Sequence, residues 1–209
     1  VAVSLYPLVN HPSRALAGWG LTAKLNRSLG MVTRTTAAAA TELPTVHMAW
    51  EAGVGFRYAF SNARRPASVT AGVSVVGRSF TVDRDPLPTD VTLDLPDVTY
   101  LLVAPRLAGE FPLSPRFSLT AGAQFLLALD AGAIQSSAEY GQASITGFAA
   151  ELGAHIGLSG RFRIDILAEM AQLGFDFVGG AVQTNNRDGD AMSLDVAGAL
   201  DRHFAVGAG

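Results

Sequence analysis

The sequence predicts an all-β protein, a transmembrane up-and-down antiparallel β-barrel of 8–10 strands, with ten strands favoured over eight. Three observations lead to this prediction. Residues 45–60 alternate between apolar and polar side chains, the same alternation recurs along the chain, more weakly in some segments, and the connections between these segments alternate between short and long. Together these features occupy the whole length, so we expect a single barrel domain over residues 1–209.

The clearest predicted strand covers residues 45–60. Successive side chains of a strand leave opposite faces, so a period of two residues indicates a β-strand. One face is large and apolar, and it carries Val46, Met48, Trp50, Ala52, Val54, Phe56, Tyr58 and Phe60. The other face mixes His47, Glu51 and Arg57 with glycine and alanine. Strands of soluble sheets are most often about five or six residues long. A longer strand with one large apolar face and one face that carries ionisable residues favours a barrel whose apolar side contacts lipid.

The remaining strands follow from the same alternation. With 45–60, the predicted strands are 17–30, 66–82, 97–111, 116–130, 143–158, 162–178 and 190–201. Short alternating stretches at 1–9 and 203–209 raise the count from eight to ten. Ten strands leave no unpaired backbone at an edge in lipid. Eight strands instead keep both termini on the short-turn rim, as bacterial barrels normally do.

The connections between these strands fall into two classes. Short ones with turn residues are expected at 10–14, 61–66, 112–116, 159–161 and 201–203, and long polar or proline-rich ones at 31–44, 83–97, 130–143 and 178–190. Short turns on one rim and long loops on the other are typical of outer-membrane barrels.

Aromatic residues lie on the apolar face and beside the short turns, where an interfacial girdle belongs. The predicted lipid-facing and girdle residues are Trp50, Phe56, Phe60, Phe111, Phe117, Phe162 and Phe204.

The composition agrees with a membrane barrel and excludes other classes. Charged residues are 16% of the chain, below the roughly 25% of soluble domains, and the mean hydropathy is +0.28. No apolar run is long enough for a transmembrane helix. The net charge of −3 and the scattered basic residues argue against a nucleic-acid partner. The chain has no cysteine, which fits an oxidising envelope compartment but also many other locations.

The pattern as a whole resembles the small outer-membrane β-barrel proteins of Gram-negative bacteria, the broad class with OmpA-like and OmpW-like architecture. The resemblance implies a location in the bacterial outer membrane, with the lipid bilayer as a partner. Members of that class usually end in an aromatic insertion signal. Here the last residues are Val206, Gly207, Ala208 and Gly209, and Phe204 is the nearest candidate.

With the apolar face outside, the interior of the barrel would hold charges of both signs. The predicted polar network consists of Lys24, His47, Glu51, Arg57, Arg106, Glu110, Glu151, His155, Arg163, Asp165, Glu169 and Asp195. In a narrow barrel such side chains fill the interior, and unpaired charges there are costly. We therefore expect a structural network of ion pairs, with a pore lining as the alternative. No metal site and no cofactor are predicted.

The sequence assigns no catalytic residue and leaves enzymatic activity as the less favoured interpretation. His47 with Glu51 and His155 with Glu151 are each four residues apart on one strand, too far for a direct hydrogen bond. No serine adjoins a histidine in a recognisable motif. The favoured function is structural, anchoring or interactive, with other envelope proteins bound through loops 31–44, 83–97, 130–143 and 178–190. The alternatives are a narrow channel for ions or small hydrophobic solutes, an outer-membrane hydrolase, and a soluble lipocalin-like binder.

Overall fold

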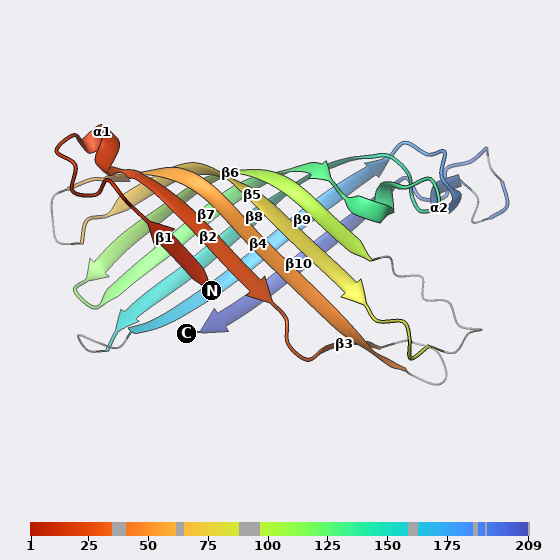
Figure 1. Cartoon of the computed structure of the whole chain (residues 1–209), viewed down its shortest axis with the longest axis horizontal. Helices are drawn as coiled ribbons and strands as arrows, with labels where there is room; N and C mark the ends of the chain where they lie inside the picture. The colour runs from red at the N-terminus through yellow and green to blue at the C-terminus, as the bar shows by residue number, and fades with distance from the viewer. Residues whose placement is uncertain are drawn as a thin grey trace.

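The chain forms a β-sheet protein with very little helix (Figure 1). In the structure, a computed structural model, 67% of residues are in strands and 6% in helices. It describes residues 1–34, 41–61, 65–87, 97–158, 163–185, 188–190 and 192–208, and for Arg14, Arg163 and Ala208 only the backbone. The strands are β1 (Ala2–Leu5), β2 (Trp19–Arg27), β3 (Met31–Arg34), β4 (Glu42–Ala59), β5 (Ser68–Val82), β6 (Val98–Ser114), β7 (Phe117–Asp130), β8 (Ala143–Gly157), β9 (Arg163–Phe177) and β10 (Gly198–Ala208). The helices are α1 (Arg14–Ala17), the 3₁₀ turn η1 (Gly132–Gln135) and α2 (Val182–Asn185).

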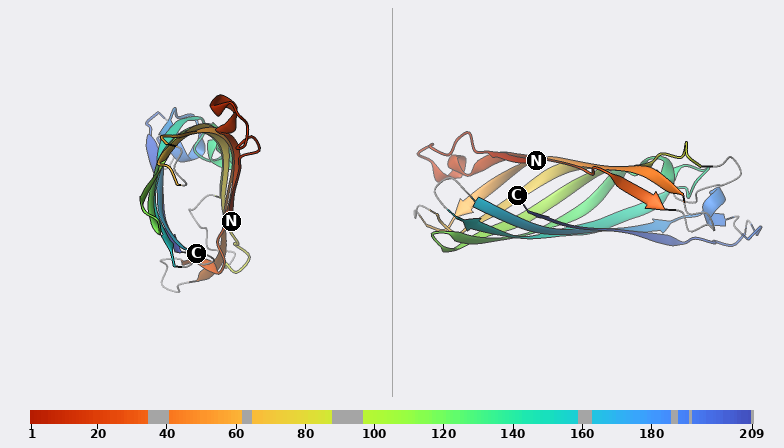
Figure 2. Two further views of the ribbon diagram at one scale, coloured as in Figure 1. Left: turned by 90° about the vertical axis from the view of Figure 1, so that its left-hand side faces the viewer. Right: turned by 90° about the horizontal axis from the view of Figure 1, so that it is seen from below.

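All ten strands belong to one antiparallel sheet. Its order is β1-β2-β4-β5-β6-β7-β8-β9-β10, and β3 pairs with β4 beside this path. The predicted all-β class and the favoured count of ten strands are confirmed. Among the described residues no backbone pairing joins β1 to β10. The sheet nevertheless curls strongly, and Figure 2 shows its strands outlining most of a flattened ring.

The tenth strand is not where the sequence placed it. We expected a turn at 201–203 with a separate strand after it, but β10 runs through these residues. Its pairing with β9 is continuous from Gly198 opposite Asp176 to Ala208 opposite Ile166, so its backbone groups on that side are satisfied without a turn. The additional strand is β3, which lies inside the predicted loop 31–44 and pairs with the start of β4.

The predicted strand 190–201 also begins later than expected, at Gly198. Before it, the Asp190 carboxylate accepts a hydrogen bond of 2.9 Å from the Met192 N–H. Such local side-chain to backbone bonds compete with strand pairing. They account for the irregular path of this segment.

The two ends of the sheet differ in their connections. The direct connections β4–β5, β6–β7 and β8–β9 lie at one end together with α1, and η1 and α2 lie at the other (Figures 1 and 2). We call these the short-connection end and the long-connection end. The predicted division into two rims agrees with this arrangement.

The outer face of the sheet is apolar and uncovered. Trp50 of β4 is 39% exposed and Leu152 of β8 is 66% exposed. Trp50 lies over Gly77 of the paired strand β5, where an added Cβ would come within 2.2 Å of the indole Nε1. Glycine at this position therefore makes room for the aromatic ring on the outer surface.

The inner face is divided along its length. Toward the long-connection end it holds a dry cluster, which we call the apolar plug. Its members are Val76, Tyr100, Leu102, Ala104, Leu126, Ala131, Ile134, Ile145, Ala171, Leu173, Phe175 and Phe177. They come from β5 to β9 and from η1, so the plug ties together strands on different sides of the curled sheet. Such close packing makes a core sensitive to the loss of a few methyl groups.

We expect Leu173→Ala to lower the free energy of unfolding by about 2–5 kcal/mol, because Leu173 is 2% exposed inside the plug. The matched control is Leu113→Ala at the outer end of β6, where leucine is 61% exposed, and a change of about 1 kcal/mol or less is expected there. Denaturant titration in the medium that keeps the protein folded measures both values. Equal losses in the two variants would contradict a packed plug.

Candidate functional site: a polar cavity inside the sheet

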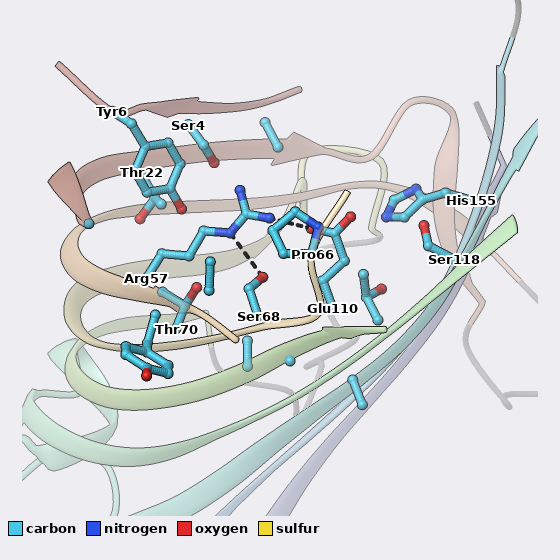
Figure 3. Close-up of a pocket in the computed structure, with 18 of the residues that line it drawn as sticks. Ser4, Tyr6, Thr22, Arg57, Pro66, Ser68, Thr70, Glu110, Ser118 and His155 are labelled. Atoms are coloured by element: carbon cyan, nitrogen blue, oxygen red, sulfur yellow. Dashed lines mark hydrogen bonds and ion pairs between the residues drawn. The ribbon is translucent and has the colours of Figure 1, made fainter. Parts of the chain in front are cut away.

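A cavity of about 1380 Å³ occupies the inner face toward the short-connection end. Ser61, Arg65 and Arg116 line it near the connections, and Lys24 and Glu51 line it deeper inside. Figure 3 shows part of its wall, where polar side chains from several strands point into one space. The interior is thus polar toward one end and apolar toward the other.

Ion pairs and amide contacts cross the inner end of this cavity. Lys24 of β2 contacts Glu169 of β9, Arg106 of β6 contacts Glu151 of β8, and the Gln124 amide of β7 donates to Glu51 of β4 at 3.1 Å. We call these six residues the polar belt: Lys24, Glu51, Arg106, Gln124, Glu151 and Glu169. They join strands that are not neighbours in the sheet, so the belt spans the interior.

The belt fits only because the wall opposite Glu151 carries no side chain. A Cβ added at Gly122 would lie 2.7 Å from Glu151 Oε1 and 2.9 Å from its Cγ. At Gly122 this space is occupied by the Glu151 carboxylate that contacts Arg106, so the absence of a side chain makes room for the ion pair.

A third ion pair, between Arg57 and Glu110, lies nearer the mouth of the cavity. The Arg57 guanidinium donates to the Ser68 hydroxyl at 2.9 Å and to the Glu110 carboxylate at 3.1 Å, as drawn in Figure 3. The guanidinium also lies 6.0 Å from the centre of the Tyr6 ring, a distance at the limit of a cation–π contact. These contacts hold Arg57 against the wall.

A histidine and an aspartate pair directly on the next part of the wall. His155 of β8 and Asp165 of β9 are register partners, and Nδ1 of the imidazole lies 2.6 Å from Oδ1 of the carboxylate. On its other side His155 is the register partner of Ser118 in β7. Three adjacent strands thus place a hydroxyl, an imidazole and a carboxylate in one row.

Two more histidines, from strands far apart in the sheet order, stack against each other. The rings of His47 in β4 and His203 in β10 stack with centroids 5.1 Å apart. Near them, Asp201 accepts a hydrogen bond from the Tyr100 hydroxyl at the edge of the plug. The first and last thirds of the sheet therefore approach each other across the interior.

The structure places most residues of the predicted polar network on the inner face. These are Lys24, His47, Glu51, Arg57, Arg106, Glu110, Glu151, His155, Asp165 and Glu169. Asp195 was expected on a strand and is not: it precedes β10, and its N–H donates to the Thr184 carbonyl at 2.6 Å. The backbone of Arg163 begins β9, and its side chain lies outside the described part.

The predicted girdle residues lie at different places in the sheet. Phe60 and Phe111 are exposed beside the short connections, Phe117 is half-buried at the start of β7, and Phe162 lies outside the described residues. Phe204 was expected beside a turn, but it lies within β10 opposite Met170, because that turn does not exist. Trp19 was not among the predicted girdle residues. Its ring packs edge-on against Phe56, with the ring centroids 5.7 Å apart.

Several interior residues were missed by the sequence analysis as site residues, among them Tyr6, Gln124 and Ser118. The sequence shows that they are polar and alternate with apolar neighbours, but their partners depend on strand register. The pairing of His155 with Asp165 could have been predicted, because the two positions are symmetric about the turn expected at 159–161 and so lie opposite each other.

The long connections carry contacts of their own. Asp97 accepts hydrogen bonds from the Arg84 guanidinium at 2.9 Å and from the Val82 N–H at 3.0 Å. Partial burial opposes its ionisation, but these two bonds and the Arg84 charge outweigh it, so the pKa of Asp97 lies below its usual value. Asp90 and Asp94 of the predicted loop 83–97 lie outside the described residues.

Within the described ranges, no group of three or more histidine, aspartate or glutamate side chains is placed to hold a metal ion. No described helix has the length and apolar character needed to cross a membrane.

Comparison with known proteins returned no matching family model, no similar curated protein and no similar solved structure. Function must therefore be inferred from the residues and their geometry.

We expect Glu151→Gln to lower the free energy of unfolding by about 1–3 kcal/mol, because it leaves the buried part of Arg106 without a charged partner. The matched control is Glu42→Gln. Glu42 pairs with Arg34 at 2.6 Å, but their side chains are 55% and 70% exposed, so about 0–1 kcal/mol is expected. Denaturant titration compares the two. A larger loss at Glu42 than at Glu151 would contradict an energetic role for the belt.

Proposed function

We propose that this chain is an integral β-barrel of a bacterial outer membrane, with an occluded interior and a structural, anchoring or interaction role in the envelope. The observation that carries this proposal is the distribution of side chains across the sheet. Large apolar groups cover the outside, whereas the ion pairs lie inside. A bilayer is the solvent that suits this arrangement.

The outer face supports a lipid environment on energetic grounds. Water in contact with apolar surface costs about 25 cal/mol per Å², and extended apolar patches on soluble monomers are unusual. Trp50, Phe125 and Leu152, on three different strands, all point outward with much of their surface uncovered. A lipocalin-like soluble binder would turn these side chains into an apolar cavity, and here that space holds the polar belt.

A membrane location requires the sheet to close. Each unpaired N–H or C=O in hydrocarbon costs several kcal/mol, so the free edge of β10 must meet the edge formed by β1 and β2. Two contacts support this closure: Lys24 of β2 with Glu169 of β9, and His47 of β4 with His203 of β10. Both draw the strands near one edge toward those near the other.

The interior supports an anchor more than a channel. A solute that entered the cavity from the short-connection end would first meet the polar belt and then the apolar plug. Leu102, Leu126 and Leu173 of the plug are 0–2% exposed, so these side chains offer a solute almost no accessible surface. A narrow channel remains the second candidate, because the cavity itself is large.

The long connections are the surface on which we place interactions with other envelope proteins, since loops on a rigid scaffold commonly carry binding. The described part of this end contains η1 and α2, and the η1 residue Ile134 packs into the plug. This packing would hold the base of the loops in a defined position for a partner.

Lipid contact can be tested through the chain's two tryptophans. In the Trp19→Phe variant only Trp50 emits, and we expect brominated lipids to quench it, because its indole lies on the outer face. The control carries Phe175→Trp in a Trp19→Phe, Trp50→Phe background, which places the reporter in the plug. Quenching of the plug reporter alone, or stable solubility of the parent protein without detergent, would contradict the proposal.

Planar-bilayer recording separates the anchor from the channel. We expect no steady conductance steps from the reconstituted protein, because the belt and the plug block the interior. A larger porin measured in the same bilayers serves as the positive control. Reproducible single-channel steps would favour the channel.

A further inference from the structure

The row of hydroxyl, imidazole and carboxylate on the cavity wall has no role in the proposed anchor. Ser118, His155 and Asp165 lie on β7, β8 and β9, and the register places His155 directly opposite both of the others. We propose that they form a serine-type acyl-transfer centre that hydrolyses small carboxylic esters entering the cavity from the short-connection end.

The imidazole is oriented as such a centre requires. An ionised carboxylate only accepts hydrogen bonds, so the proton between His155 Nδ1 and Asp165 Oδ1, 2.6 Å apart, resides on the nitrogen. In the neutral imidazole, Nε2 is then the nitrogen that can accept a proton. Asp165 is thereby the positioning residue that selects the tautomer.

The serine lies within reach of that imidazole. Directly opposed residues of an antiparallel pair have Cβ atoms about 4.5–5.5 Å apart, and rotation of the Ser118 hydroxyl brings it toward the ring. Ser118 and His155 both line the cavity, and Figure 3 shows them next to each other on its wall. A bound molecule can touch both groups, while Asp165 stands behind the histidine.

The environment fits an ester as the substrate. The side chains of His155 and Asp165 are 30% and 35% exposed, so solvent and solutes reach the site while the wall shields one side. Arg116 lies two positions before Ser118 and lines the same cavity, and a cation directed toward Ser118 would favour the negative charge that develops there. Because the row faces inward, the substrate arrives through water and not from the lipid.

The chemistry balances with water as the second reactant. The Ser118 oxygen bonds to the carbonyl carbon of the ester while its proton passes to His155 Nε2. The carbon–oxygen bond to the alcohol breaks, and the alcohol leaves with that proton. Water then gives a proton to Nε2 and adds to the acyl carbon, which releases the carboxylic acid and restores the Ser118 hydroxyl.

A fluorophosphonate probe tests this centre in the full-length protein folded in detergent, with peptide mapping by mass spectrometry. We expect one label on Ser118, formed with loss of fluoride, and turnover of p-nitrophenyl acetate that the label abolishes. Ser118→Ala should remove both. His155→Gln should slow labelling about 100-fold or more, since it removes the general base.

Two further variants separate catalysis from structure. Ser4→Ala changes another serine of the same cavity wall, on β1, and should label at the parent rate. Asp165→Asn should lower the maximal labelling rate but leave unchanged the probe concentration at which labelling reaches half of its maximal rate. A general loosening of the cavity wall would change both quantities.

The proposal is overturned if the folded parent protein is not labelled at Ser118, or if His155→Gln labels at the parent rate. Mapping on the parent protein keeps the test decisive even where a variant fails to fold. The result is independent of lipid quenching and of conductance, so an inert Ser118 would leave the proposed anchor untouched.

Discussion

The structure depends on one electrostatic constraint: the charges that the strand alternation directs inward must be compensated across the interior. Arg106 and Glu151 reach over β7, Arg57 and Glu110 reach over β5, and Lys24 and Glu169 join the first part of the sheet to the last. Strands two positions apart lie about 10 Å from each other, so arginine and glutamate meet there by leaning over the strand between them. Lys24 and Glu169 join β2 to β9, which only a curled sheet brings together. All three pairs offset the cost of removing charges from bulk water.

The interior is divided into a polar and an apolar half because some inner positions of the strands carry apolar residues in place of polar ones. Inner positions of β6 and β9 change along the strand from charged residues to Tyr100, Leu102, Leu173 and Phe175. Leucine and phenylalanine at these positions seal one half, and arginine, glutamate and serine leave the other half hydrated. One continuous sheet thus combines an end filled by packed apolar side chains with a cavity lined by polar ones.

The sequence predicts the strands well because a period of two is a local signal. Residues 45–60 fall within β4 apart from Phe60, and 143–158 correspond to β8 with a difference of one residue. The error at 201–203 came from giving polar residues turn character where pairing with β9 overrides it. Partners across the interior, such as Gln124 with Glu51, depend on the curl of the whole sheet and leave no local trace. The row through Ser118 was hidden for the same reason: a long connection separates β7 from β8, so its length does not fix their register.

The shortness of β1 has a consequence for how the molecule fluctuates. β1 pairs with β2 only from Ala2 to Leu5, whereas β4 pairs with β5 from Thr45 to Ala59. Fewer ladder bonds mean a lower free energy of local opening, and amide exchange is fastest in such segments. The wall formed by β1 beside Lys24 is accordingly expected to open more readily than the wall formed by β4 and β5. Transient opening of β1 would widen the polar half of the interior toward the side where, among the described residues, no pairing joins β1 to β10.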